Sequence, residues 1–521
     1  MFSASGISFG AVPLRHPQTE HLLFNIPLPL GFFSAPFVNG GVSVDGKLSY
    51  YPAGTIELEP GKIDAKVYRL NVEGGDRKFF RSDAFLHDYY KSEKGLQIGW
   101  GAAGKYQEIE RMDYEDNYLK LWNGSGRLQI KGDEGRFDVI SGIGRNEFGA
   151  RGYYGAPVKY PAMENVDDNI ILVSAELGDR EDSFLRFSSV YRSQKDTYLL
   201  DRFNPSFYKN IHHTDASAAG ADGLLGLTSN MKFLYRVVAE YEKLDSSNLG
   251  KHDRSRGEGS ISLAYDGFNP AVNAGFRVQM FEEEKSALNP FLLIRTTHNE
   301  EGYFYASYSA LKREPSYTEL YYHSIANKGN PDLSYSESHS VFLGYRMEKK
   351  GMFSADTGTF ARKENHSVDW LWNTNSTKWE ATDVGEVDTY GMWAGTALFY
   401  NDFLIKGTYS FLHKESDYNF YASRYMFDYP EHLFHFSVAW RLMKRVSLSF
   451  AQAIRYQTLN PERTSNRTGK GAEAGIIWQP TGNEAVQVKL LCENLWNDDF
   501  QFLPGQKPVS RLVSLGLTVA W

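Results

Sequence analysis

The chain has 521 residues, a formal net charge of −8, a single cysteine and a mean hydropathy of −0.45. Its 15% aromatic and 23% charged residues exclude a disordered protein, and its acidic balance offers no basic surface for nucleic acid. One cysteine permits no internal disulfide, and we find no run of about 18 uncharged apolar residues that would predict a transmembrane helix.

Apolar residues recur at every second position along much of the chain. In chain order, such runs cover 63–72, 96–102, 137–143, 170–177, 233–241, 272–280, 303–310, 341–347, 403–411, 434–442, 446–456, 486–492 and 513–521. The last run is the most regular, because one of its two faces is entirely apolar and carries Val513, Leu515, Leu517, Val519 and Trp521. This period is typical of amphipathic β-strands.

The connections between the runs differ in length. Short turns alternate with longer polar stretches, such as 204–222 and 243–258, which we interpret as loops. Tight turns at one rim and long loops at the other are typical of a transmembrane barrel, whose alternating strands average to a polar hydropathy. Dividing about 460 residues into units of about 21 predicts an all-β, antiparallel barrel of about 22 strands over residues 62–521.

A soluble β-sandwich or propeller would show the same alternation. Aromatic residues gather near the ends of the runs, as in Tyr303, Phe304 and Tyr305, and this favours the interfacial girdles of a membrane barrel. In hydrocarbon an unpaired backbone group is costly, so we expect the first and last strands to pair. The strand 513–521 would then close the barrel and place Trp521 at a membrane rim.

Several motifs resemble those of TonB-dependent outer-membrane receptors, the family that includes cobalamin and siderophore transporters. The most specific are Pro315-Ser-Tyr-Thr-Glu-Leu-Tyr-Tyr, followed by Gly329-Asn-Pro-Asp-Leu and Ser336-Glu-Ser, and the C-terminal Glu493-Asn-Leu-Trp-Asn-Asp-Asp-Phe with Pro504-Gly. Weaker matches begin at Glu147, Asp201, Asp245 and Val384. Their collinear order over several hundred residues supports the resemblance.

The N-terminal part departs from the family pattern. Val12-Pro-Leu, Pro17-Gln-Thr and Asn25-Ile-Pro-Leu-Pro-Leu resemble pieces of the plug, the domain that fills the barrel lumen in this family. Other plug elements are missing, so we expect residues 1–61 to be a partial plug remnant. We recognise neither a signal peptide nor the TonB-contacting box in this segment, and the resemblance therefore implies a receptor that is incomplete at its N-terminus.

Four aromatic residues are our candidates for ligand contact: Tyr153, Tyr154, Trp370 and Trp372. Aromatic faces at loop tips can stack on flat ligands, although a position in the interfacial girdle is the alternative interpretation. Sequence motifs of enzymes are not recognisable, so we expect no enzyme and no cofactor.

We assign no chemistry to two further polar clusters or to the single cysteine. His212, His213 and Asp215 carry metal-ligating atoms, but adjacent histidines on an extended segment point in opposite directions, and we interpret the three as a polar loop without a metal. The run Glu282–Glu284 is interpreted as a solvated rim, and Cys492 as a residue packed in a strand.

The resemblance implies a monomeric receptor in the outer membrane of a Gram-negative bacterium. Its function would be TonB-dependent uptake of a scarce solute, such as cobalamin or an iron chelate, and its partners would be membrane lipid, the small ligand and, in full-length members, TonB. A passive outer-membrane channel without TonB coupling and a soluble, β-rich carbohydrate-binding protein remain as alternatives.

Overall fold

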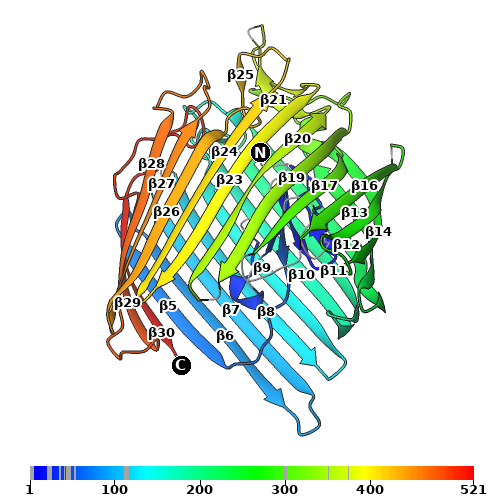
Figure 1. Cartoon of the computed structure of the whole chain (residues 1–521). Coiled ribbons are helices and arrows are strands. Elements are labelled where there is room, and N and C mark those ends of the chain that lie inside the picture. Colours follow the sequence, from blue (N-terminus) through cyan, green and yellow to red (C-terminus); the bar gives the residue numbers. More distant parts are fainter. Residues whose placement is uncertain are drawn as a thin grey trace.

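The computed structural model describes residues 5–19, 26–34, 37–39, 42, 48–51, 54–110, 117–282, 284–296, 302–349, 351–373 and 375–521. Its main element is a closed antiparallel barrel of 22 strands (Figure 1), which confirms the fold class expected from the alternating pattern. Among the described residues, no helix is long and apolar enough to cross a membrane.

The barrel strands follow one another in chain order around the wall. They are β5 (Val67–Gly75), β6 (Phe80–Lys91), β7 (Gln97–Glu110), β8 (Tyr118–Lys131), β9 (Gly135–Gly149), β10 (Met163–Asp179), β11 (Ser183–Leu199), β12 (Lys209–Thr228), β13 (Met231–Ser246), β14 (Gly250–Tyr265), β15 (Ala271–Phe281), β16 (Ala287–Arg295), β17 (Tyr303–Arg313), β19 (Ser336–Lys349), β20 (Phe353–Asn365), β23 (Val387–Tyr400), β24 (Phe403–Glu415), β26 (Pro430–Met443), β27 (Val446–Gln457), β28 (Thr468–Trp478), β29 (Val486–Glu493) and β30 (Leu512–Ala520).

The last strand closes the barrel onto the first. β30 pairs antiparallel with β5, from Ser514 opposite Gly75 to Ala520 opposite Arg69. Its apolar residues Val513, Leu515, Leu517 and Val519 alternate with buried Ser514 and Thr518, and the first three of these apolar residues are exposed on the outer face. Trp521 stacks on Tyr68 with the ring centroids 6.0 Å apart, so both chain ends of the barrel meet at one rim.

The two rims differ in the length of their connections. The rim that holds the C-terminus has short turns, such as 229–230, 401–402 and 479–485. The opposite rim, here called the loop rim, carries long connections that include 150–162, 314–335, 366–386 and 416–429. Figure 1 shows β21 (Val368–Trp372) and β25 (Ala422–Ser423) rising above this rim, where they form a small sheet with β18 (Asn327–Lys328) and β22 (Trp379–Asp383).

The described residues between 5 and 61, here called the lumen segment, lie inside the barrel. They form a four-stranded sheet of β1 (Ser5–Phe9), β2 (Val12–Leu14), β3 (Phe37–Asn39) and β4 (Gly54–Leu58), with a 3₁₀ turn at Leu30–Phe32. Phe9, Val12 and Phe32 are fully buried, and they belong to one apolar core with wall residues such as Ile140 and Leu172. The lumen segment is therefore packed onto the inner face of the wall.

Buried arginines of the wall also join the lumen segment to the barrel. Arg186 on β11 pairs with Asp222 on β12 at 2.7 Å and reaches Glu59 of the lumen segment at 2.7 Å. Arg127 on β8 donates to the carbonyl oxygen of Phe32 at 2.6 Å and pairs with Asp138 at 2.7 Å. These contacts give buried backbone and carboxylate oxygens charged hydrogen-bond donors.

Two stretches interpreted from the sequence as loops are instead largely strand. Most of 204–222 belongs to β12, and 243–258 is divided between β13 and β14 around the turn 247–249. The prediction was wrong because these strands carry polar side chains on the lumen face, which hides the apolar alternation. A barrel strand needs an apolar outer face only where it meets lipid.

Candidate ligand-binding cavity

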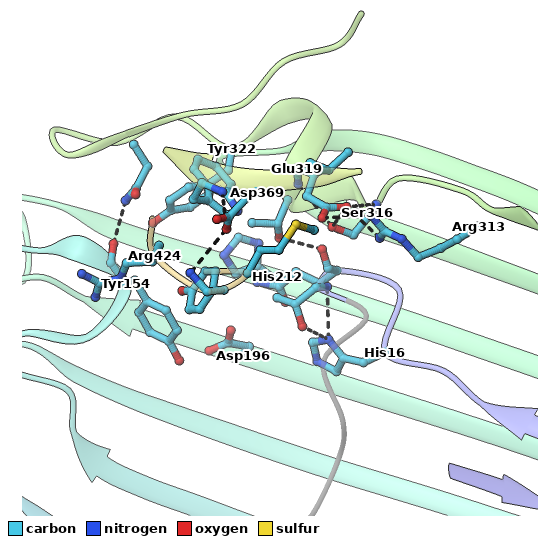
Figure 2. Close-up of a pocket in the computed structure, with 18 of the residues that line it drawn as sticks. His16, Tyr154, Asp196, His212, Arg313, Ser316, Glu319, Tyr322, Asp369 and Arg424 are labelled. Atoms are coloured by element: carbon cyan, nitrogen blue, oxygen red, sulfur yellow. Dashed lines mark hydrogen bonds and ion pairs between the residues drawn. The ribbon is translucent and has the colours of Figure 1, made fainter. Parts of the chain in front are cut away.

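A cavity of about 370 Å³ lies inside the barrel near the loop rim. The lumen segment contributes His16, Gln18 and Thr19 to its lining, and strands β9–β12 form one side. The other side comes from β19, β20 and β24, and the loops 150–162, 314–335, 366–386 and 416–429 complete it (Figure 2). The cavity is therefore bounded jointly by the wall, the loops and the lumen segment.

The loop 314–335 is held at the cavity by a short helix, α1 (Tyr317–Tyr321). Ser316 and Glu319 form a capping box at its start, in which each side chain bonds the backbone N–H of the other residue. Burial opposes ionisation of Glu319, but the charge of Arg313 at 3.1 Å and the hydrogen bonds within the box keep the pKa of this carboxyl below its usual value. The family-like motif that begins at Pro315 thus builds one side of the cavity.

This loop is also bonded directly to the lumen segment. The backbone N–H of Thr318 donates to the carbonyl oxygen of Gln18 at 2.9 Å, and the hydroxyl of Thr318 donates to the same oxygen at 2.6 Å. A movement of the lumen segment at Gln18 would therefore change the position of a cavity-lining loop.

Tyr154 enters the cavity from the loop 150–162. It has a φ of 55°, in the left-handed region that non-glycine residues rarely adopt, and its carbonyl oxygen accepts a hydrogen bond from the Asn327 side chain at 2.7 Å. Its hydroxyl donates to Glu164 Oε2 at 2.5 Å. Burial and the neighbouring carboxylates Glu164 and Asp196 raise the pKa of Tyr154 well above its usual value, so the phenol stays a hydrogen-bond donor.

Trp370 reaches the cavity from β21 in the small loop sheet. The preceding residue, Asp369, accepts hydrogen bonds from the Ser423 hydroxyl and from the backbone N–H of Trp370 at 2.8 Å. Burial raises the pKa of Asp369, although the Ser423 hydrogen bond opposes this effect. Trp370 is 9% exposed and packs with Val368 and Ala422, which fixes its position at the cavity wall.

Of the four aromatic candidates, Tyr154 and Trp370 line the cavity, whereas Tyr153 and Trp372 do not. Tyr153 packs edge-on against Phe148, and Trp372 packs edge-on against Trp379 with the ring centroids 5.6 Å apart. All four lie in loop-rim connections, outside the barrel strands where girdle residues are found.

The histidine cluster considered in the sequence analysis does not lie in a loop. His212 is buried on the lumen face of β12, where its Nδ1 is 2.8 Å from the Ser246 hydroxyl, and it lines the cavity. The polar loop predicted for His212, His213 and Asp215 is wrong, because all three lie in β12. Within the described part of the chain, no three His, Cys, Asp or Glu side chains are arranged to hold a metal ion.

Two remaining candidates lie away from the cavity. Glu282 and Glu284 lie in the connection 282–286 at the loop rim, and Glu283 lies outside the described residues. Cys492 lies in β29 and is partly buried.

Sequence reasoning missed most of the polar cavity lining, including Glu164 on β10, and Gln194 and Asp196 on β11. These side chains come from polar stretches without a recognisable motif. Their alternation with outward-facing residues is visible in the sequence, but their convergence depends on the register between β10 and β11, in which Val166 lies opposite Asp196.

No known family model matches the sequence, and no curated protein sequence matches it. Solved structures do match over nearly the whole chain. The FrpB iron transporter from Neisseria meningitidis (F3-3 variant) is 12% identical, with a TM-score of 0.75 over 99% of this chain and 92% of that one. The siderophore receptor PirA from Acinetobacter baumannii is 11% identical, with a TM-score of 0.75 over 100% of this chain and 91% of that one.

A third solved structure, the copper transporter OprC, is 11% identical, with a TM-score of 0.76 over 100% of this chain and 90% of that one. This chain therefore has the fold of these proteins, which are transporters and receptors and not enzymes. The likeness agrees at the level of fold with the resemblance to TonB-dependent receptors found in the motifs.

Proposed function

We propose that this protein is an outer-membrane receptor of a Gram-negative bacterium that takes up a scarce small solute through TonB-dependent transport. The observation that carries this proposal is the cavity bounded jointly by the loops, the barrel wall and the lumen segment. In a transporter of this kind, the loops admit the ligand from outside and the lumen segment blocks its passage. The fold shared with an iron transporter, a siderophore receptor and a copper transporter supports the proposal.

In this proposal residues 1–61 act as a partial plug. Gln18 lines the cavity and also bonds Thr318 of the loop 314–335, so displacement of the lumen segment would open the cavity toward the barrel interior. TonB would supply the pull on this segment. The solute would be a metal chelate or cobalamin, with Tyr154 and Trp370 stacking on its flat parts.

Uptake by living cells tests the proposal. The chain is produced in the outer membrane of a Gram-negative host that lacks its own receptors, and uptake of radiolabelled iron chelates and cobalamin is measured with and without a protonophore. We expect energy-dependent uptake of one of them and a loss of about tenfold in Trp370→Ala. Trp372→Ala is the matched control, because Trp372 does not line the cavity. Uptake that is equal with and without the protonophore would contradict TonB coupling.

A passive channel is the second candidate, and one observation favours it. On β26 the lumen-facing His435 and Ala439 are exposed, and Ser437 between them is half-buried. A water-filled passage along this side of the lumen would conduct ions without TonB. Planar-bilayer recording separates the two functions: steady, large conductance supports the channel, and silence supports the occluded receptor.

A further inference from the structure

Hydrogen-bond acceptors gather at one end of the cavity. Glu164 on β10, Gln194 and Asp196 on β11, and Gln18 of the lumen segment all line it, and each is more than nine-tenths buried. In the barrel register, Val166 lies opposite Asp196 and Asp168 lies opposite Gln194, so these side chains share the lumen face of two adjacent strands. Asp196 lies between Tyr154 and His16 in the view of Figure 2. We call these four residues the acceptor cluster.

Three oxygens of the acceptor cluster have no hydrogen-bond partner among the described residues: Gln18 Oε1, Gln194 Oε1 and Asp196 Oδ1. The fourth member, Glu164, accepts a hydrogen bond from the hydroxyl of Tyr154 and also shares one with Asp196, whose carboxyl group is hydrogen-bonded to Gln18 as well. Most buried polar atoms in folded proteins are paired, so several unpaired acceptors at one cavity wall indicate a place for donors from another molecule.

The cluster also lacks positive charge. Three other carboxylates that line the cavity form ion pairs: Asp168 lies 2.7 Å from Arg192, Glu319 lies 3.1 Å from Arg313, and Glu364 lies 3.4 Å from Arg362. Asp369 also lines the cavity and accepts a hydrogen bond from the Ser423 hydroxyl instead. Within the described part of the chain, Glu164 and Asp196 have no ion pair. A bound group that carried both a positive charge and N–H donors would supply what these two carboxylates and two amide oxygens lack.

We propose that the acceptor cluster binds a cationic, N–H-bearing group of the ligand, an alkylammonium or a guanidinium. This inference rests on the proposed function, because it takes the cavity as the ligand site. An organic cation fits better than a metal ion, since no three His, Cys, Asp or Glu side chains among the described residues converge on one point. A planar guanidinium carries five donors, and the rings of Tyr154 and Tyr198, 5.7 Å apart, border the same space.

Two probes of the same shape test the proposal: butylguanidinium, which is cationic, and butylurea, which is neutral. Each is titrated into the full chain in detergent by isothermal titration calorimetry, at millimolar concentrations. We expect butylguanidinium to bind at least ~10-fold more tightly than butylurea. The double variant Glu164→Gln with Asp196→Asn should lose this preference. The control Glu415→Gln with Asp417→Asn removes the same charge from exposed positions outside the cavity and should keep it.

A second variant distinguishes a loss of binding from a folding defect. Gln194→Leu removes an acceptor that has no partner, so the barrel should keep its heat-modifiable migration while butylguanidinium binds about tenfold more weakly. Equal binding of both probes, no binding of butylguanidinium, or unchanged binding by the double variant would overturn the proposal. So would tight binding of CaCl₂ that displaces the probe, because the cluster would then be a metal site. Calorimetry does not depend on transport, so failure here is separate from failure of the uptake experiment.

Discussion

Two parts of the barrel wall both carry apolar side chains on the outside, but their lumen-facing side chains differ in burial. On β6–β17, here called the first wall, Ile140, Leu172 and Val190 are buried against the lumen segment. On β19–β30, here called the second wall, lumen-facing residues of β26 such as His435 are exposed. Apolar side chains alternate with inward-facing ones on both walls, whereas the chemistry of the inward side chains follows what packs against them.

Ion pairs show the same contrast. Arg186 of the first wall pairs with Glu59 of the lumen segment, whereas Arg346 of the second wall pairs with Asp356 on the neighbouring strand. The first type of contact holds the lumen segment in place, and the second type joins two strands of the wall. Substitutions on the first wall should therefore lower the stability of the protein much more than substitutions on the second wall.

The largest effect is expected for Arg186→Ala. Arg186 is 1% exposed and pairs with both Asp222 and Glu59, so its loss breaks two ion pairs around a buried charge and should cost about 3–5 kcal/mol, although Glu59 still pairs with Arg180 at 2.8 Å. This loss of stability is measured by guanidinium unfolding of the detergent-solubilised chain and by the rate of proteolysis within residues 5–61. Arg441→Ala, at an exposed lumen-facing position of the second wall, should change stability by less than about 0.5 kcal/mol. Equal losses of stability in the two variants would contradict the expected difference between the two walls.

Truncation of a buried apolar residue should have the next largest effect. Leu172 is fully buried between β10 and the lumen segment, and Leu172→Ala should destabilise the protein by about 2–5 kcal/mol. Leu433→Ala is the matched change on the second wall, where the side chain is half-buried, and about 1 kcal/mol or less is expected. The unfolding midpoints of both variants provide the comparison. A larger loss for Leu433→Ala would show that the second wall is also packed.

Cysteine labelling measures how accessible the lumen-facing positions of the two walls are to water. In a Cys492→Ser background, Ser188→Cys places a thiol at a lumen-facing position that is 4% exposed, beneath the lumen segment. Ser437→Cys places one at a half-buried, lumen-facing position of the second wall. A charged, water-soluble thiosulfonate should react at least ~10-fold more slowly at position 188. Similar rates at both positions would mean that the lumen segment does not cover the first wall in solution.

The smallest effect is expected where a loop meets the lumen segment. Thr318→Val removes the hydroxyl bond to the carbonyl oxygen of Gln18 but keeps the backbone bond, so about 0.5–1.5 kcal/mol should be lost locally. Faster hydrogen exchange of the N–H of Thr318 reports this loss. The same substitution at Thr408, on the lumen face of the second wall, should leave exchange of that loop unchanged. An unchanged rate in Thr318→Val would show that the backbone bond alone holds the loop.

Much of the fold could be predicted from the sequence, whereas the cavity could be predicted only in part. The alternation of Val513, Leu515 and Leu517 identified the strand that pairs with β5, because period two is a local property. Polar strands such as β12 were missed, because their inward side chains are as hydrophilic as those of a loop. The aromatic candidates were divided, since only the second of the adjacent Tyr153 and Tyr154 lines the cavity, although both pack against the same buried cluster.

The sequence by itself determined an all-β chain in which most strands present one apolar face, because the alternation of side chains at period two is a local property of each strand. Only the tertiary structure decided that Gln18, Glu164 and Asp196 line the same cavity. Their convergence depends on barrel closure, strand register and the path of the lumen segment, and these long-range relations leave no periodic signal in the chain.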